Sequence, residues 1–239
     1  MVKGYAAPSL LDTYTEERAP VIAEMLKRST SLFDKAQHVK ADGTNVEGAW
    51  YRGGELHMLG VNCRWSSIVL DERTPKETIP VDPYGVSHSD PSVSLLRAGE
   101  RAPDAPGLQV VETGDGDVHK TTSLLDIFGP SYHTVLIFSD GTEKAKEMIS
   151  ALKHYPEDLV VTVLIHSNGA AGLSGCTDAH LSVIDREGHA HDGYRVGQDD
   201  FMTFIVRPDG VVGGVVCRVH GARRYLDGLL GATEVSAHL

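Results

Sequence analysis

In residues 9–35, mostly apolar side chains recur at intervals of three and four residues and would therefore lie on one face of a helix. This spacing predicts an amphipathic helix. The predicted stripe consists of Leu11, Tyr14, Ile22, Met25, Ser29 and Leu32. Pro20 has no amide hydrogen, so we expect it to kink or divide this helix. A second apolar stretch, residues 55–70, predicts one or two short strands.

Residues 74–94 contain four prolines and few large side chains, which is typical of an extended linker. The chain therefore divides into three predicted parts. Residues 1–73 hold the helix and the short strands, residues 74–94 form the linker, and residues 95–239 form a carboxyl-terminal domain.

Beyond the linker, short apolar strands alternate with helices. We expect strands at residues 108–111, 134–138, 159–165, 201–206 and 211–216, and helices at residues 142–154 and 222–230. Residues 123–128 predict a short helix or a turn, and residues 181–184 a strand or a helix. The last two strands flank Arg207-Pro208-Asp209-Gly210, a turn sequence that joins them in a hairpin. This order predicts an α/β fold, a thioredoxin-like mixed β-sheet with flanking helices.

The formal net charge of the chain is −11. Because a negative field repels a phosphate backbone, we expect no nucleic-acid partner. No apolar run approaches the ~20 residues that span a bilayer, and no secretory signal opens the sequence, so we expect no membrane contact and a cytoplasmic protein. The tripeptide Ala237-His238-Leu239 resembles a peroxisomal targeting signal, which makes a peroxisomal location the alternative.

Several segments resemble flavin-dependent aromatic hydroxylases of the phenol hydroxylase type, over nearly the whole chain. Residues 8–20, PSLLDTYTEERAP, are similar to the signature that opens a helix after the family's last flavin-contacting motif. Residues 59–69, LGVNCRWSSIV, resemble the strand that follows, although Cys63 stands where the family commonly has tyrosine. Residues 97–104 and 204–210 resemble the entry to the family's thioredoxin-like carboxyl-terminal domain and its Val-Arg-Pro-Asp-Gly hairpin.

The segments by which this family holds its cofactors do not occur in the sequence. None of the 25 glycines falls in Gly-x-Gly-x-x-Gly, the turn that brings a helix amino terminus to a dinucleotide pyrophosphate. The resemblance implies FAD and NADPH for full-length relatives only, and we expect this chain alone to bind neither. We expect a carboxyl-terminal piece made as its own protein, whose amphipathic helix folds back on the thioredoxin-like domain or forms a dimer interface.

Thiol chemistry is not expected. A thioredoxin-type site needs Cys-x-x-Cys after the strand at residues 134–138, where the sequence has Ser139-Asp140-Gly141-Thr142. Cys63, Cys176 and Cys217 are far apart in sequence, as free thiols of a reducing compartment are. A peroxidatic role for Cys176 is the alternative to a small residue in a glycine-rich turn.

Two groups of polar residues are candidates for ligand binding or acid–base chemistry. The first consists of Tyr51, Arg64, Ser66 and Ser67, beside Trp65. The second consists of His166, Asp178, His180, His189 and His191. The first group would line a small-molecule pocket or simply pack. In an extended segment the imidazoles at positions 189 and 191 would share one face, but a polar turn fits the same pattern, and we assign no metal.

Three functions remain open at this point. The chain is an accessory module that forms a homodimer or pairs with a full-length flavin monooxygenase. Alternatively, it is a cofactor-free acid–base enzyme, such as an isomerase, cyclase or epoxide-opening enzyme, acting on an aromatic or polyketide-like molecule of secondary metabolism. The third reading is one subunit of a split monooxygenase whose partner brings FAD and NADPH. Fold resemblance alone does not choose between them.

Overall fold

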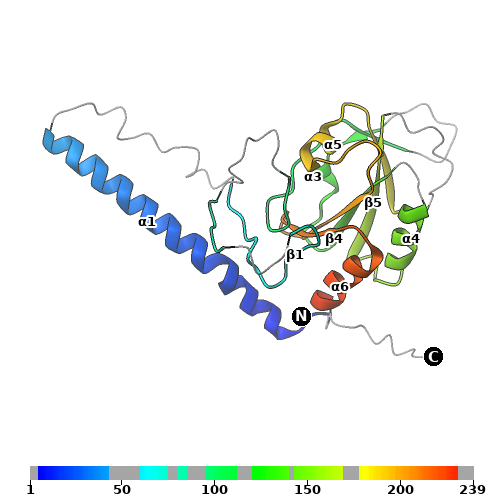
Figure 1. Ribbon diagram of the computed structural model, residues 1–239, viewed down its shortest axis with the longest axis horizontal. Helices are drawn as coiled ribbons and strands as arrows, with labels where there is room; N and C mark the ends of the chain where they lie inside the picture. Colours follow the sequence, from blue (N-terminus) through cyan, green and yellow to red (C-terminus); the bar gives the residue numbers. More distant parts are fainter. Residues whose placement is uncertain are drawn as a thin grey trace.

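Figure 1 shows a computed structural model of the chain, in which a sheet flanked by helices carries one long helix at its side. The structure describes residues 5–42, 60–74, 80–85, 95–111, 120–139, 143–168 and 178–230. The helices are η1 (Pro8–Leu11), α1 (Asp12–Asp42), α3 (Leu124–Ile127), α4 (Glu143–Leu152), α5 (His189–Tyr194) and α6 (Val219–Leu230). The strands are β1 (Leu70–Asp71), β2 (Leu108–Val110), β3 (Thr121–Thr122), β4 (His133–Phe138), β5 (Val160–Ser167), β6 (Leu181–Asp185), β7 (Met202–Val206) and β8 (Val212–Val216).

One sheet contains all of these strands, in the order β1-β8-β7-β4-β5-β6-β2-β3. The central strands β4, β5 and β6 are parallel, whereas β7 is antiparallel to β4 and β8 is antiparallel to β7. A β-α-β unit followed by a β-hairpin and a helix, with this strand order, is the arrangement of thioredoxin-like folds. The predicted fold class is confirmed, and residues 181–185 form a strand.

The sheet has a separate apolar core on each face. In β4, Leu136 and Phe138 belong to one core, while Val135 and Ile137 belong to the other, because successive side chains of a strand point to opposite faces. Helices α4 and α6 cover the Val135 face, and α3 and α5 lie on the opposite side (Figure 1). Burial of apolar surface therefore holds this part of the molecule together.

Residues 60–74 lie against the β8 edge of the sheet. Strand β1 pairs in parallel with β8, with Leu70 opposite Gly214. Of the predicted strands at residues 55–70, only Leu70 is in a strand; residues 60–69 form turns, and residues 55–59 lie outside the described residues.

A glycine allows the next segment to approach these turns closely. Gly99 has φ +91°, and a Cβ there would collide with the backbone of Arg64. With no side chain in the way, the Gly99 carbonyl accepts a hydrogen bond from the Cys63 amide at 2.8 Å. Cys63 and Val69 are thereby buried in the same core as Phe204 of β7.

Helix α1 is continuous from Asp12 to Asp42, so of the two outcomes expected at Pro20, a kink or a division, the division does not occur. Pro20 has no N–H to donate to the carbonyl of Glu16, its helical partner four residues earlier. The indole Nε1 of Trp65 donates to that carbonyl instead, at 3.1 Å. A side chain from a distant segment thus replaces the hydrogen bond that proline removes.

Only part of the predicted stripe turns toward the protein: Met25 and Leu32 are half-buried, whereas Leu11, Tyr14 and Ile22 are exposed. Glu17 and Val21 are the buried residues of α1, among those whose side chains the structure describes. Large apolar side chains remain exposed along α1 and at the end of η1, and we call this set the α1 apolar face: Leu11, Tyr14, Ile22, Leu26 and Phe33. The ion pair between Glu17 and Arg207 turns the Glu17 face of α1 inward.

Several predictions concern residues outside the described part of the chain: Tyr51, Cys176, most of the linker at residues 74–94, and Ala237-His238-Leu239. Among the described helices, none has the length and apolar character needed to cross a membrane.

Candidate functional site

Three segments far apart in sequence meet where α1 crosses the sheet domain. We call the residues that join them the α1 clamp: Glu16, Glu17, Trp65, Ser66, Ser67 and Arg207. Glu16 and Glu17 are in the first turns of α1, the next three residues precede β1, and Arg207 follows β7.

A two-pronged ion pair between Glu17 and Arg207 forms the centre of the α1 clamp. Arg207 Nη1 donates to Glu17 Oε1 at 2.7 Å, and Nη2 donates to Oε2 at 3.0 Å. Glu17 Oε1 also accepts from Ser66 Oγ at 2.6 Å, and Arg207 Nη2 also donates to Asp209 at 2.7 Å. Both side chains are almost buried, 9% exposed for Glu17 and 12% for Arg207. Such a two-pronged, charge-assisted pair is strong, and it fixes the orientation of the two side chains relative to each other.

Both partners are held in their charged forms. Burial alone would raise the pKa of Glu17, but hydrogen bonds from Arg207 and Ser66 outweigh it and keep this pKa below its ordinary value. Burial alone would lower the pKa of Arg207, yet the hydrogen bond to Glu17 and the charge of Asp209 raise it. At neutral pH the pair is therefore a fixed link, not a proton donor or acceptor.

Glu16 extends the α1 clamp toward the surface. Its Oε1 accepts from the Ser67 amide at 2.8 Å and its Oε2 from Ser67 Oγ at 2.6 Å. Its backbone carbonyl is the acceptor for Trp65. The Ser66 and Ser67 hydroxyls, expected either to line a small-molecule pocket or simply to pack, thus donate to α1, as the neighbouring Trp65 does.

Arg64, the neighbouring candidate, also has partners within the protein. Its Nε donates to Asn62 Oδ1 at 3.0 Å, its Nη2 donates to the Gly85 carbonyl, and its Nη1 lies 3.7 Å from Glu100. Asn62 in turn donates to the Pro83 carbonyl at 3.2 Å. These bonds fasten residues 80–85 to the turn that precedes the α1 clamp.

His191 does form an acid–base pair, but with Asp185 instead of another histidine. Asp185 Oδ2 accepts from the His191 ring Nδ1 at 2.8 Å and from its amide at 2.9 Å. Both side chains are buried, 8% and 1% exposed. Burial would raise the pKa of Asp185, but the His191 hydrogen bonds outweigh it and lower this pKa. The pair joins α5 to β6.

The other candidates do not converge on His191. Residues 189–194 are helical, so neither the extended segment nor the polar turn is correct, and His189 is exposed while His191 is buried. His180 bonds Thr162 Oγ1 at 2.8 Å, and Asp178 pairs with Lys153 at 2.8 Å. His166 is buried within β5. Within the described ranges, no group of three or more histidine, cysteine or carboxylate side chains is placed to hold a metal.

The two described thiols are poorly suited to nucleophilic chemistry. Burial raises the pKa of Cys63 to about 12, and burial also raises the pKa of the exposed Cys217. A thiolate is the reactive form, so a raised pKa disfavours redox exchange. Ser139, which follows β4 where thioredoxins have their first cysteine, is buried.

The sequence did not reveal the pairing of Glu17 with Arg207, which are 190 positions apart. The usable signal was that both residues fall inside segments that resemble one family, Glu-Glu-Arg at residues 16–18 and Val-Arg-Pro-Asp-Gly at residues 206–210. Charged residues in such segments can either bind a ligand or form ion pairs with each other.

Sequence comparison relates the chain to a flavin-dependent monooxygenase. It is 30% identical over 186 residues to a flavin-dependent monooxygenase of Mycobacteroides abscessus. The aligned region covers 76% of this chain but 31% of that protein. The chain thus spans about a third of the length of the curated relative that it matches. No protein-family model matches the chain.

Solved structures give a similar result for the fold. The flavin-dependent monooxygenase PieE, solved with FAD and substrate, matches 95% of this chain and 41% of its own, with a TM-score of 0.58 and 21% identity. Mycobacterium tuberculosis AhpC matches 56% of this chain and 98% of its own at a TM-score of 0.44 and 17% identity. The chain is therefore similar to one part of flavin-dependent monooxygenases, in sequence to one and in fold to another.

Proposed function

We propose that this chain is an accessory module of a flavin-dependent monooxygenase system, which contributes dimer contacts and no flavin chemistry of its own. One observation carries the proposal: the α1 clamp holds α1 in a fixed orientation that turns its apolar face outward. The similarity to flavin-dependent monooxygenases supports the association with such a system.

The α1 apolar face has the spacing of an interface. Leu11, Ile22 and Phe33 are 11 residues apart, about three helical turns, so they lie in one row. Their side chains are 61%, 50% and 62% exposed, and Tyr14 and Leu26 flank the row. Burying each such side chain would contribute roughly 1.5–3 kcal/mol. Several large exposed apolar side chains on one face of a helix are typical of an interaction site.

Charge favours a second copy of this chain as the partner. Residues 12–26 contain four acidic residues and one basic residue, whereas residues 27–42 contain four basic and two acidic. Two α1 helices that pair in antiparallel orientation place the acidic half of each against the basic half of the other. This arrangement has the twofold symmetry that most dimers adopt.

A split enzyme is the second candidate. The match to PieE covers 95% of this chain, so it includes most of α1, and it leaves more than half of PieE unmatched. A separate flavin-binding polypeptide is therefore the alternative occupant of the α1 apolar face.

Light scattering coupled to size exclusion tests the proposal. We expect a colourless homodimer, and we expect the I22Q/F33Q variant to be a folded monomer. The matched control is Leu125→Gln on α3, which changes a side chain that is also exposed, at 59%, and should remain dimeric. A monomeric wild-type chain contradicts pairing with itself, and stoichiometric FAD in the purified chain contradicts the accessory role. A stable complex with a co-expressed flavin protein, lost in I22Q/F33Q, selects the split enzyme.

A further inference from the structure

We propose that a cavity beside α6, unrelated to the α1 apolar face, binds an organic anion: a carboxylate or phosphate on an apolar body. The cavity has a volume of about 870 Å³ and lies between residues 67–74, residues 97–98 and α6. We call it the arginine cavity, because five arginines line it: Arg64, Arg73, Arg97, Arg218 and Arg224.

Two carboxylates also line the arginine cavity, and both are engaged by the protein. Asp71 accepts from Arg73 Nε at 3.0 Å and Nη2 at 2.9 Å, and from the Ala98 amide at 3.2 Å. Glu72 accepts from the Cys217 amide at 2.6 Å and lies so close to Gly221, in the first turn of α6, that a Cβ there would collide with it. These carboxylates therefore hold the walls of the cavity.

Three arginines of the lining have no carboxylate partner among the residues that the structure describes. Arg73 pairs with Asp71, and Arg64 lies 3.7 Å from Glu100. Within the part of the chain that the structure describes, Arg97, Arg218 and Arg224 form no ion pair. Positive charges around one cavity repel each other, and an anion between them relieves that repulsion. Guanidinium groups match the geometry of carboxylate and phosphate oxygens.

The rest of the lining indicates an apolar body on the ligand. Ile68, Leu70 and Leu229 line the same cavity as the arginines. The volume falls in the range of roughly 300–1,000 Å³ that small-molecule sites have. An inorganic anion would meet the arginines but leave this apolar wall in water, so an organic anion fits better. The accumulation of cations is local, because the chain as a whole carries −11.

Calorimetry with three naphthalene probes tests the charge requirement. We expect 2-naphthoate and 2-naphthyl phosphate to bind with 1:1 stoichiometry, with an affinity that falls as salt is added. We expect the neutral 2-naphthalenemethanol to bind at least tenfold more weakly. The tighter of the two anions identifies the carboxylate or the phosphate class. Equal binding of the neutral probe, or no binding of either anion, overturns the proposal.

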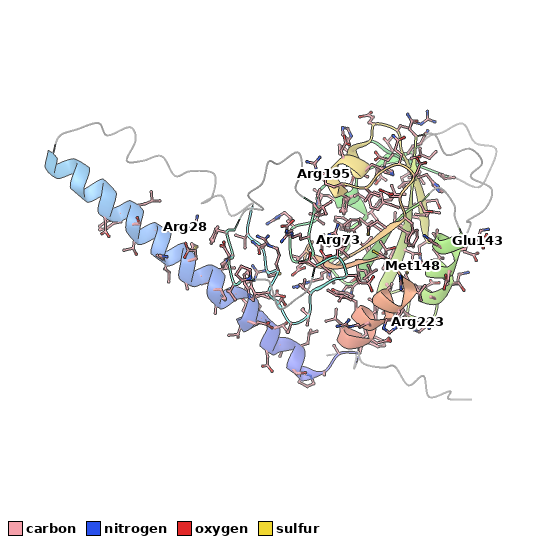
Figure 2. All side chains as sticks on the ribbon, in the orientation of Figure 1. Arg28, Arg73, Glu143, Met148, Arg195 and Arg223 are labelled. Atoms are coloured by element: carbon pink, nitrogen blue, oxygen red, sulfur yellow. The ribbon has the colours of Figure 1, made fainter. Side chains whose placement is uncertain are left out.

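Two adjacent arginines of α6 provide a matched pair of variants. Arg224 lines the cavity and Arg223 does not, although both side chains are exposed on α6. Figure 2 labels Arg223 on this helix. Arg224→Gln should lower the binding affinity of the anionic probes by roughly tenfold, which is the effect of losing one charge-assisted hydrogen bond. Arg223→Gln makes the same change in net charge and should bind as the wild type does. Equal weakening by both substitutions would mean a diffuse field and no site.

Cys217 reports occupancy independently, since this exposed free cysteine is one of the residues that line the arginine cavity. In a Cys176→Ser background, neutral iodoacetamide should label Cys217, and saturating 2-naphthoate should slow that labelling several-fold. Arg224→Gln should remove the protection and Arg223→Gln should retain it. Unchanged labelling under saturating probe would place the binding elsewhere and contradict the assignment.

Discussion

The thioredoxin-like sheet and helix α1 belong to one structure but are held by different forces. The sheet buries aliphatic and aromatic side chains on both faces, whereas the inward face of α1 buries Val21 and the charged Glu17. Apolar burial is spread over many residues and has no preferred direction. The α1 clamp depends on a few directional bonds, so α1 should detach under conditions that leave the sheet folded.

The largest expected effect is on the sheet. Phe204 is fully buried, with its ring 4.9 Å from Tyr194 and 5.7 Å from Phe138. Phe204→Ala removes this packing and should lower the free energy of unfolding by about 4 kcal/mol, measured by urea titration. Leu125→Ala, at a side chain 59% exposed, should change it by less than about 0.5 kcal/mol. Equal effects would mean that the sheet is not held by its core.

Breaking the α1 clamp should have the next largest effect. Glu17→Gln leaves the Arg207 charge almost buried with Asp209 as its remaining carboxylate partner, at a cost of about 3 kcal/mol. Because that cost falls on the attachment of α1, trypsin should cut at Arg18 and Lys27 roughly 100-fold faster. The control Glu143→Gln breaks an exposed pair with Lys146 and should leave these cleavage rates unchanged.

Acid should open the α1 clamp through the same carboxylate. The pKa of Glu17 is lower in the folded protein than its ordinary value of 4.5. Its contribution is therefore complete above pH 4.5 and is lost as the pH falls through the folded pKa. In a Trp50→Phe background, Trp65 emission should shift to the red in this acid range, and Glu17→Gln should remove that transition. A transition that persists in Glu17→Gln would have another origin, such as Asp185, whose pKa is also lowered.

The smallest effect concerns the Trp65 hydrogen bond to the Glu16 carbonyl. Trp65→Phe removes the donor and should weaken α1 attachment by about 1 kcal/mol. Pro20→Ala restores a helical N–H for the same carbonyl, so the cost of Trp65→Phe should be smaller in that background. A double-mutant cycle with purely additive effects would show that the indole does not compensate for the proline.

The sequence predicted the sheet much better than it predicted α1. Apolar runs at residues 134–138 and 159–165, with a Pro-Asp-Gly turn near the end, were sufficient for the succession of strands and helices along the chain, because period and turn chemistry are local signals. The inward face of α1 was missed, because Glu17 meets Arg207 across 190 positions and no local pattern reports that pairing. Trp65 replacing the donor that Pro20 lacks is equally non-local.

The candidate site residues were found as chemical types, but the sequence did not predict their partners. Ser66 and Ser67 were identified as donors, yet their acceptors are the carboxylates of α1 and no small molecule is needed to satisfy them. His191 was paired with His189 on the assumption of an extended segment, whereas a short helix separates the two rings. Only Arg64 and Ser67 of the arginine cavity were among the candidates for a pocket lining, because its other arginines are spread as far as residue 224 and form no local pattern.

Hydrogen–deuterium exchange on the wild type and on Glu17→Gln measures most directly whether a polar clamp fixes α1 to an independently stable sheet. We predict that the substitution raises exchange of α1 amides by roughly 100-fold while β4, β5 and β7 keep their protection. Two results would contradict the claim that a polar clamp fixes α1 to an independently stable sheet. In one, the α1 amides still exchange slowly in Glu17→Gln; in the other, their exchange rises together with that of the central strands.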